Sequence, residues 1–430
     1  MLLALSSPMV RRTLLLAAVV LAGTLSFFAV RFAAAEYFSS LDTLAGFEEA
    51  VRLEPGNARH WHLLGRYWQF GLDQQDFPRA IELYRHSLLL DPRAPAVWLD
   101  LASAYETQGD LSSARSALLS AKKSHPVSAE VAWHYGNFLL RQGEMDSAFA
   151  EIHRSLESDP SRTAEAVSVC WSANPDSQVL LGQVLPSSPV VYLAALQVLA
   201  ADGAVDASLD VWNRLAALHP HFPLQEASPF LDLLLRTAHG TEAAQVWKQA
   251  LEFAEIPDPG GPSGSVLWDG GFESNVRNGL SWRIQEDKGV QIGYDGAVKH
   301  SGRQSLRIHF DGSRNLGFSG VCQVVPVTPL TAYQFSGWMR TETITSDRGI
   351  FVALSSRDSP SVSTPELRAT EPWTPWTLSW QAGKDSRIAQ ICVSRAPSQK
   401  FDNKIAGTAW LDDLALVPLP AAPSPEKVRP

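Results

Sequence analysis

The residues that could do chemistry in this chain are two histidine pairs and one carboxylate pair. His60 and His62 stand two positions apart, as do the two histidines within residues 219–221, and a helix would turn such side chains in different directions. Asp412 and Asp413 are adjacent in an alternating segment, so a strand would place them on opposite faces. None of these spacings predicts a catalytic or metal-binding constellation.

The sequence also lacks the short motifs of common catalytic sites. It contains no glycine-rich phosphate loop, no G-x-S-x-G elbow and no H-E-x-x-H pair. A glycosidase with two acids across a cleft needs no such motif, so that alternative stays open. The net charge of -9 is spread along the chain and offers no basic patch for nucleic acid. We predict a protein that is not an enzyme and binds no nucleic acid.

The three cysteines are too few for a disulfide framework, and they lack metal-ligand spacing. Cys322 and Cys392 both fall in the strand-rich part of the chain, where they could pair outside the cytoplasm. Sequence does not place their Cβ atoms, so whether they form a disulfide is left open.

An uncharged stretch near the N-terminus predicts a membrane segment. Residues 13–30 are 18 apolar or small residues, which give ~27 Å of helix against ~30 Å of hydrocarbon. Arg11 and Arg12 precede the stretch and several acids follow it, so the positive-inside rule leaves the N-terminus in the cytoplasm. Residues 1–36 are predicted to be a cytoplasmic stub and signal-anchor in a bacterial inner membrane, with the bulk of the chain in the periplasm.

The alternative is a secreted protein, released by cleavage near Ala35. Residues 33–35 are three alanines of the kind that signal peptidases accept. The apolar run is longer than the usual signal core of 7–15 residues, and Arg31 interrupts the approach to the alanines. We therefore favour the uncleaved anchor.

Prolines at regular spacing follow the membrane segment. The intervals between Pro55, Pro92, Pro126 and Pro160 are 37, 34 and 34 residues, a period typical of helix-turn-helix solenoids. The segments between the prolines carry matching large and small residues at helical spacing. They are Trp61, Leu64, Gly65, Trp68, Ala80 and Tyr84; Trp98, Leu101, Ala102, Tyr105 and Ala114; and Tyr135, Gly136, Leu139, Ala148 and Ile152.

This pattern resembles the tetratricopeptide repeat family. The small residues would let paired helices approach closely, and Gly109 and Gly143 would let the chain turn. We predict a solenoid over residues 37–255, clear in 58–160 and degenerate in 161–255. Its first helix would fall at the membrane segment. The resemblance implies that the solenoid binds a protein partner.

Beyond a Pro-, Gly- and Ser-rich linker at 256–265, the hydrophobic period changes from that of a helix to that of a strand. Residues 266–418 are predicted to form an antiparallel β-sandwich or jelly roll, and 419–430 a disordered tail. Seven short strands are expected, at 305–310, 320–327, 333–340, 349–355, 376–381, 389–394 and 409–417.

Ordered motifs in this domain resemble carbohydrate-binding modules of family 4/9. They are Asp269–Glu273 (DGGFE), Trp282, His300–Gly302 (HSG), Phe335–Arg340 (FSGWMR) and Trp410–Leu414 (WLDDL). The resemblance implies a structural Ca²⁺ held by Glu273 and Asp412; the alternative is that Asp412 caps a loop through hydrogen bonds. Strand alternation would put Trp410, Asp412, Leu414 and Leu416 on one face.

A sugar site is expected where aromatic and polar side chains share a face. Trp338 and Arg340 have the parity opposite to Tyr333, Phe335 and Met339, which we assign to the core. Trp338 and Arg340 are therefore the first candidate ligand contacts. Trp373 and Tyr294, expected on loops, are the second. Four further tryptophans are assigned to the core: Trp282, Trp376, Trp380 and Trp410.

Together these features predict a membrane-anchored, non-enzymatic scaffold. The repeats would bind a protein partner and the sandwich a glycan or protein, with no cofactor required. This architecture is similar to that of accessory components of bacterial cell-surface polysaccharide assembly or export. Two alternatives remain: a lectin-like protein with the repeats as a stalk, and an unrecognised glycan-active enzyme.

Overall fold

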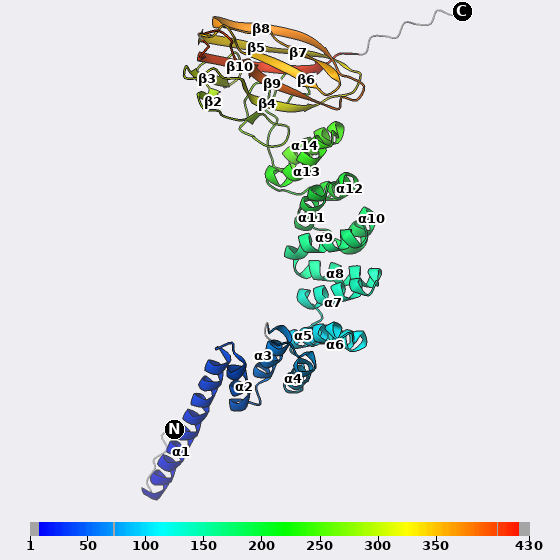
Figure 1. Ribbon diagram of the computed structural model, residues 1–430, viewed down its shortest axis with the longest axis vertical. Helices are drawn as coiled ribbons and strands as arrows, with labels where there is room; N and C mark the ends of the chain where they lie inside the picture. Colours follow the sequence, from blue (N-terminus) through cyan, green and yellow to red (C-terminus); the bar gives the residue numbers. More distant parts are fainter. Residues whose placement is uncertain (1–7, 72–73, 402, 421–430) are drawn as a thin grey trace, which may run out of the picture. The chain divides into compact units, whose positions relative to one another are not determined.

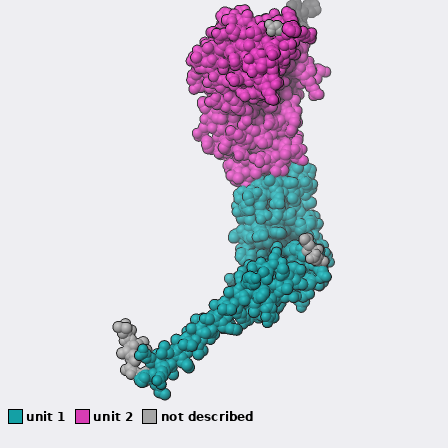
Figure 2. Space-filling model, turned by 60° about the vertical axis from the view of Figure 1, so that its left-hand side comes forward, with its two compact units in different colours: residues 1–186 teal, residues 187–430 magenta. Residues whose placement is uncertain are grey.

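The computed structural model describes residues 8–71, 74–401 and 403–420, which fall into two compact units. Residues 1–186 form the first unit and residues 187–430 the second (Figure 2). Helices make up the first unit, and a second set of helices followed by strands makes up the second (Figure 1). The predicted fold class, a helical solenoid followed by an antiparallel β-sandwich, is confirmed. Residues 421–430 of the expected disordered tail lie outside the described residues.

The first unit is built of antiparallel helix pairs. Most helices begin at a polar residue whose side chain accepts a backbone N–H of the first turn, as Asp76 does from Arg79 and Ser128 from Val131. The helices are α1 (Pro8–Ser39), α2 (Leu44–Leu53), α3 (Ala58–Phe70), α4 (Phe77–Leu90), α5 (Pro95–Thr107), α6 (Leu111–Ser124), α7 (Ala129–Arg141), α8 (Met145–Ser158) and α9 (Thr163–Ala173). Three short turns complete the unit: η1 (Pro160–Arg162), α10 (Ser177–Val179) and η2 (Leu180–Val184).

Small residues bring the two helices of a pair into close contact. A Cβ added to Gly65 of α3 would lie 2.6 Å from the Tyr84 ring of α4. A Cβ added to Gly136 of α7 would lie 2.7 Å from Ile152 of α8. These distances are too short for any side chain larger than hydrogen. The packing predicted from the 34-residue pattern is therefore present.

The second unit begins with two further helix pairs. They are formed by α11 (Pro189–Asp202) with α12 (Val205–Ala216), and by α13 (Ser228–Arg236) with α14 (Gly240–Phe253), with η3 (Leu224–Ala227) between the pairs. Trp212 of α12 and Trp247 of α14 are buried at the helix contacts. Both pairs lie in the stretch predicted to hold degenerate repeats. The division between the two units therefore falls inside the predicted solenoid.

Two five-stranded antiparallel sheets follow. The first sheet has the order β1-β4-β9-β6-β7 and the second the order β2-β3-β10-β5-β8, and the core lies between them. All seven predicted strands are present; β1, β2 and β7 were not predicted. The strands are β1 (Arg283–Ile284), β2 (Val290–Asp295), β3 (Ser305–Asp311), β4 (Phe318–Pro326), β5 (Ala332–Ile344), β6 (Phe351–Ser356), β7 (Ser359–Ser363), β8 (Ala369–Gln381), β9 (Ile388–Arg395) and β10 (Ala406–Pro418).

Cys322 and Cys392 lie opposite each other on β4 and β9 and are joined by a disulfide. The bond is on the outer side of the first sheet, because the residues next to the cysteines along each strand point into the core. The structure thus forms the pair that the sequence had left open.

Within the second unit, the sandwich rests directly on the last helix pair. The Trp247 ring of α14 meets the Trp268 ring edge-on, with centroids 5.3 Å apart. A Cβ on Gly279 would lie 2.4 Å from the Trp247 ring, so only glycine permits this approach. Arg283 of β1 also forms a 3.0 Å ion pair with Asp232 of α13. The predicted linker, 256–265, contains no helix or strand and lines a cavity of about 420 Å³ beside Trp247.

Candidate functional site

The outer face of the second sheet carries the side chains that sequence parity assigned to a ligand face. Trp338 of β5 lies opposite Asp412 of β10, and Arg340 lies opposite Trp410. The alternate residues of β5 are buried in the core between the sheets: Tyr333, Phe335 and Met339. The side-chain alternation predicted for this strand is therefore present.

An aromatic cluster forms at one end of this face. The His300 ring stacks on the Trp338 ring, with centroids 3.9 Å apart and planes 17° apart, and meets the Trp373 ring at 5.8 Å. Trp373 lies on β8 and not on a loop as expected, because β8 is longer at its start than the predicted strand. His300 was not recognised as a member of this face. It comes from the β2–β3 loop, and only its place in the H-S-G motif singles it out.

Tyr294 is separated from this cluster. It lies on β2 and not on a loop, opposite Leu306 of β3, whose side chain is in the core. Residues opposite each other on paired strands share a face, so Tyr294 points to the inner side of the sheet. Its ring contacts the core, and the Arg277 guanidinium lies 4.8 Å from the ring centroid. The structure does not bring Tyr294 together with Trp338 and Arg340.

A strip of two arginines and a tryptophan crosses three neighbouring strands of the same face. Trp410 of β10 lies opposite Arg307 of β3 on one side and opposite Arg340 of β5 on the other. The Arg340 guanidinium lies 5.6 Å from the Trp410 ring centroid. The indole Nε1 of Trp410 donates a 3.0 Å hydrogen bond to Asp295. Trp410 is buried as predicted. It is buried on the outer face of the sheet, between the two arginines, and not in the core between the sheets.

A β-bulge explains why strand alternation misplaced part of β10. Between Asp412 and Ala415 the strand has one residue more than its partner β5, and Asp413 has a φ of 53°. Trp410 and Asp412 consequently face outward, whereas Leu414 and Leu416 face the core. The expectation that these four residues share one face is wrong, because a single extra residue reverses every side chain beyond it.

The carboxylates of Asp412 and Glu273 hold the β2–β3 loop in place. Asp412 accepts hydrogen bonds from the backbone N–H groups of His300 at 2.8 Å and Ser301 at 3.1 Å. Glu273 accepts from the N–H of Arg303 at 2.7 Å and from its Nε at 3.0 Å. Burial raises the pKa of Asp412, and these N–H donors oppose that effect. Together the two carboxylates position His300 over Trp338.

The two carboxylates do not fit calcium in this arrangement. Calcium requires six to eight oxygen ligands. The carboxylate oxygens of Glu273 and Asp412 instead accept hydrogen bonds from N–H groups. Among the described residues, no group of three or more His, Cys, Asp or Glu side chains could hold a metal. The geometry matches the alternative in which Asp412 fixes a loop by hydrogen bonds. Calcium at these two residues remains a prediction from resemblance alone.

The solenoid of the first unit offers a polar hollow and an apolar groove. In the hollow, first helices of successive pairs are joined by ion pairs, with Arg66 2.8 Å from Asp100 and Arg141 2.7 Å from Glu106. The groove, of about 700 Å³, lies between α4, α5 and α6. Its apolar lining is Leu88, Leu89, Pro92, Trp98, Leu101, Tyr105 and Ala117.

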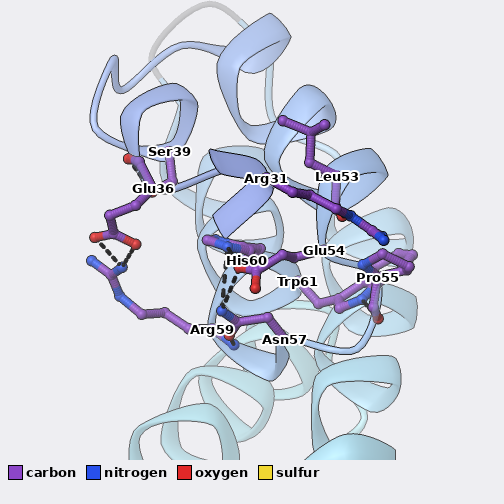
Figure 3. Close-up of polar contacts among 10 residues, drawn as sticks. All are labelled: Arg31, Glu36, Ser39, Leu53, Glu54, Pro55, Asn57, Arg59, His60 and Trp61. Carbon is purple, nitrogen blue, oxygen red and sulfur yellow. Dashed lines mark hydrogen bonds and ion pairs between the residues drawn. The ribbon is translucent and has the colours of Figure 1, made fainter. Parts of the chain in front are cut away.

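The apolar N-terminal segment and the first helix of the solenoid belong to one helix, α1. The 32 residues of α1 rise about 48 Å, which exceeds the ~30 Å hydrocarbon core. Residues 8–30 are exposed, whereas Ala35 and Ser39 are buried against α2. Arg31 donates to the Leu53 carbonyl at the end of α2, and Glu36 pairs with Arg59 of α3 at 2.7 Å (Figure 3). The end of α1 therefore serves as the first helix of the solenoid, as predicted.

The hydrogen bonds of the β2–β3 loop yield a test of the calcium expectation. Addition of Ca²⁺ or of a chelator is expected to leave the thermal unfolding temperature of the full chain unchanged, because protein N–H groups already satisfy both carboxylates. Asp412→Asn should lower that temperature in either condition, since asparagine has one accepting oxygen where aspartate has two, so either the N–H groups of His300 and Ser301 or that of Asp413 would lose its acceptor. A calcium-dependent rise of several degrees that Asp412→Asn abolishes would contradict this account and restore the metal site.

Comparisons with known proteins match separate parts of the chain. A tetratricopeptide repeat family model matches residues 71–132, which confirms the predicted repeats over that range. None of the curated proteins matches the chain.

Similar solved structures cover either the repeats or the sandwich. PilF of Pseudomonas aeruginosa is 15% identical and covers 53% of this chain and 97% of its own, with a TM-score of 0.30. TmCBM61, solved in complex with beta-1,4-galactotriose, is 18% identical over 36% of this chain and 100% of its own, with a TM-score of 0.28. The CBM22-1 xylan-binding domain of Paenibacillus barcinonensis Xyn10C is 18% identical over 38% and 100%, with a TM-score of 0.26.

Proposed function

We propose that this protein is a membrane-anchored, non-enzymatic adaptor that works in cell-surface polysaccharide assembly or export. Its solenoid binds a protein partner and its sandwich binds a glycan. The observation that carries the adaptor role is the apolar groove between α4, α5 and α6. Leu89 is 80% exposed at this groove, beside the half-buried ring of Trp98. An apolar surface of this kind in a solenoid supports binding of an apolar segment of a partner protein.

A polar substitution in the groove tests the adaptor role. Leu89→Glu should reduce by at least tenfold the amount of partner that copurifies with the full chain from membranes, because a charge would be desolvated on binding. Leu119→Glu is the matched control: Leu119 is exposed on α6 but does not line the groove. Quantitative mass spectrometry of the copurified proteins is the measurement. Equal loss in both variants, or no loss in Leu89→Glu, would count against the groove.

The geometry of α1 supports an anchor that is retained after export. Cleavage near Ala35 would cut a helix that is buried against α2, and would remove Arg31 from the Leu53 carbonyl. The disulfide between Cys322 and Cys392 supports an oxidising compartment for the second unit, because such bonds are rare in the cytoplasm. Both observations support a periplasmic location with the N-terminus in the cytoplasm.

The retained anchor predicts a chain of full length. A C-terminally tagged protein in membranes should show the mass of the complete sequence, and protease added to spheroplasts should digest the solenoid. Gly46→Val should separate α1 from α2, since a Cβ on Gly46 would lie 2.4 Å from the Phe38 carbonyl oxygen, and should expose the alanines to cleavage. Ala45→Val, at an exposed position of the same helix, is the control. A wild-type protein shortened by 35 residues would show that the segment is a cleaved signal.

The aromatic cluster of the second sheet favours a second candidate, a lectin-like protein with the repeats as a stalk. Trp338, His300 and Trp373 form a half-exposed aromatic surface next to Arg340, which suits a pyranose ring and its hydroxyl groups. In that case the sandwich alone would carry the function, and the groove would have no partner.

Glycan-array binding separates this candidate from a pure protein adaptor. The full chain in detergent should bind at least one glycan saturably, and Trp338→Ala should weaken that binding at least tenfold because His300 loses the ring on which it stacks. Tyr294→Phe, on the inner side of the sheet, should bind like the wild type. No glycan binding by a folded protein would leave protein binding as the function.

A further inference from the structure

The arginine strip on the outer face of the second sheet points to the chemistry of the ligand. Arg307 and Arg340 are half-buried on β3 and β5, with Trp410 between them. Within the described part of the chain, neither guanidinium forms a hydrogen bond or an ion pair within 4 Å; Arg340 lies against the Trp410 ring, and Arg307 is close enough to Asp295 to help lower the pKa of that carboxyl. A half-buried guanidinium without a hydrogen-bond acceptor has lost part of its hydration and gained no hydrogen bond in return.

Other arginines of the sandwich differ from this pair. Arg303 pairs with Glu273, and Arg395 donates to Ser346 and to backbone carbonyls. Arg314, Arg357 and Arg387 form no ion pair among the described residues, but they are exposed in loops, where water solvates them. The combination of partial burial, a place on a strand face and a free guanidinium is found at Arg307 and Arg340.

The contacts of Arg340 restrict the position of its guanidinium and leave its N–H donors free to bind an acceptor. Its guanidinium lies against the Trp410 ring, and the Trp410 indole is fixed by Asp295. Asp295 is fixed in turn by the N–H groups of Ala297 at 2.9 Å and Val298 at 3.1 Å. Stacking on an aromatic face leaves the in-plane N–H donors of arginine available, and these match the two oxygens of a carboxylate.

The acidic groups of this face form no ion pair with the strip within 4 Å, although Asp295 interacts with Arg307 over a longer distance. Asp295 is engaged by Trp410 and by its own loop, and Asp412 by the β2–β3 loop. Glu342 is exposed on β5, opposite Thr408, and forms no ion pair in the described structure. The two guanidinium groups stand on strands separated by β10, which corresponds to ~10 Å.

We propose that the glycan bound at this face is acidic, with carboxylate groups of uronic-acid residues received by Arg340 and Arg307. The aromatic cluster of Trp338, His300 and Trp373 lies beside the strip and would contact the sugar ring. This inference rests on the proposed glycan binding and names the class of glycan.

The test compares an acidic oligosaccharide with its neutral form. Isothermal titration of the full chain in a neutral detergent uses oligogalacturonate and the same oligosaccharide with its carboxylates methyl-esterified; glucuronate and mannuronate oligosaccharides complete the probes. At least one acidic probe should bind ten times more tightly than its ester. Rising salt should narrow that difference, because the contact is between charges.

Substitutions identify the side chains that cause the difference in affinity between the acidic probe and its ester. Arg340→Gln and Arg307→Gln should each weaken the acidic probe at least tenfold and leave the ester unchanged. Arg340→Lys should recover only part of the affinity, since an ammonium lacks the planar fork. Arg357→Gln removes the same charge at the exposed β6–β7 turn and should have no effect. Thermal unfolding of each variant checks that the sheet remains folded.

Two results would overturn the proposal in distinguishable ways. Equal binding of the acid and its ester, or equal loss in Arg357→Gln and Arg340→Gln, would show that the face binds sugars without reading carboxylates, and would leave the proposed glycan binding intact. Absence of binding to every acidic and neutral glycan by a folded protein would remove the proposed glycan binding itself, and this inference with it.

Discussion

A stack of helix pairs leaves an uncovered apolar face at its end, and in each unit one terminal helix packs against a segment that extends beyond the repeats. In the first unit, the last turns of α1 pack on α2 and bury Ala35 and Ser39. In the second unit, the sandwich covers α14 through the contact of Trp268 and Gly279 with Trp247. Without these covers, the terminal helices would expose the residues that repeats bury against each other. The end of α1 and the sandwich are thus structural parts of the helical layers in their own units.

The cover at the membrane end has a mechanical consequence. No glycine- or proline-rich spacer separates the apolar residues 13–30 from the buried residues of α1, because both belong to one helix. Arg31 and Glu36 join that helix to α2 and α3 by polar contacts (Figure 3). If α1 is the membrane anchor proposed above, a continuous helix would transmit its direction from the bilayer to the first repeat. Such a joint would hold the repeats at a more defined height above the membrane than a flexible tether could.

The parts predicted well from the sequence are those fixed by local repetition. The 34-residue spacing and the small residues Gly65 and Gly136 follow from the need of paired helices to approach closely. The strands were predicted because one face of each is buried, which forces alternation. Three strands were not predicted because they lack this pattern: β1 has two residues, β2 has one fully buried residue, and β7 has none.

The parts predicted poorly depend on single residues that local patterns do not contain. One extra residue at Asp413 reversed the expected faces of Leu414 and Leu416. The place of His300 on Trp338 depends on a loop held by Asp412, more than a hundred residues further along the chain. Tyr294 was misjudged because its partner Leu306 is known only once the register of β2 and β3 is known. Parity thus placed Trp338 and Arg340 on the outer face of the sheet, but it did not show that His300 lies between Trp338 and Trp373.

The use of carboxylates in the sandwich bears on whether this face recognises a sugar or cleaves it. A glycosidase needs two acids directed across a cleft toward the substrate. Here Asp412 and Glu273 bind backbone N–H groups, and Asp295 binds the Trp410 indole. These three acids stabilise the loop and the strip, and the side chains that remain available to a ligand are aromatic rings, guanidinium groups and the exposed carboxylate of Glu342. Aromatic rings beside guanidinium groups suit the recognition of a glycan, which is the role proposed for this face.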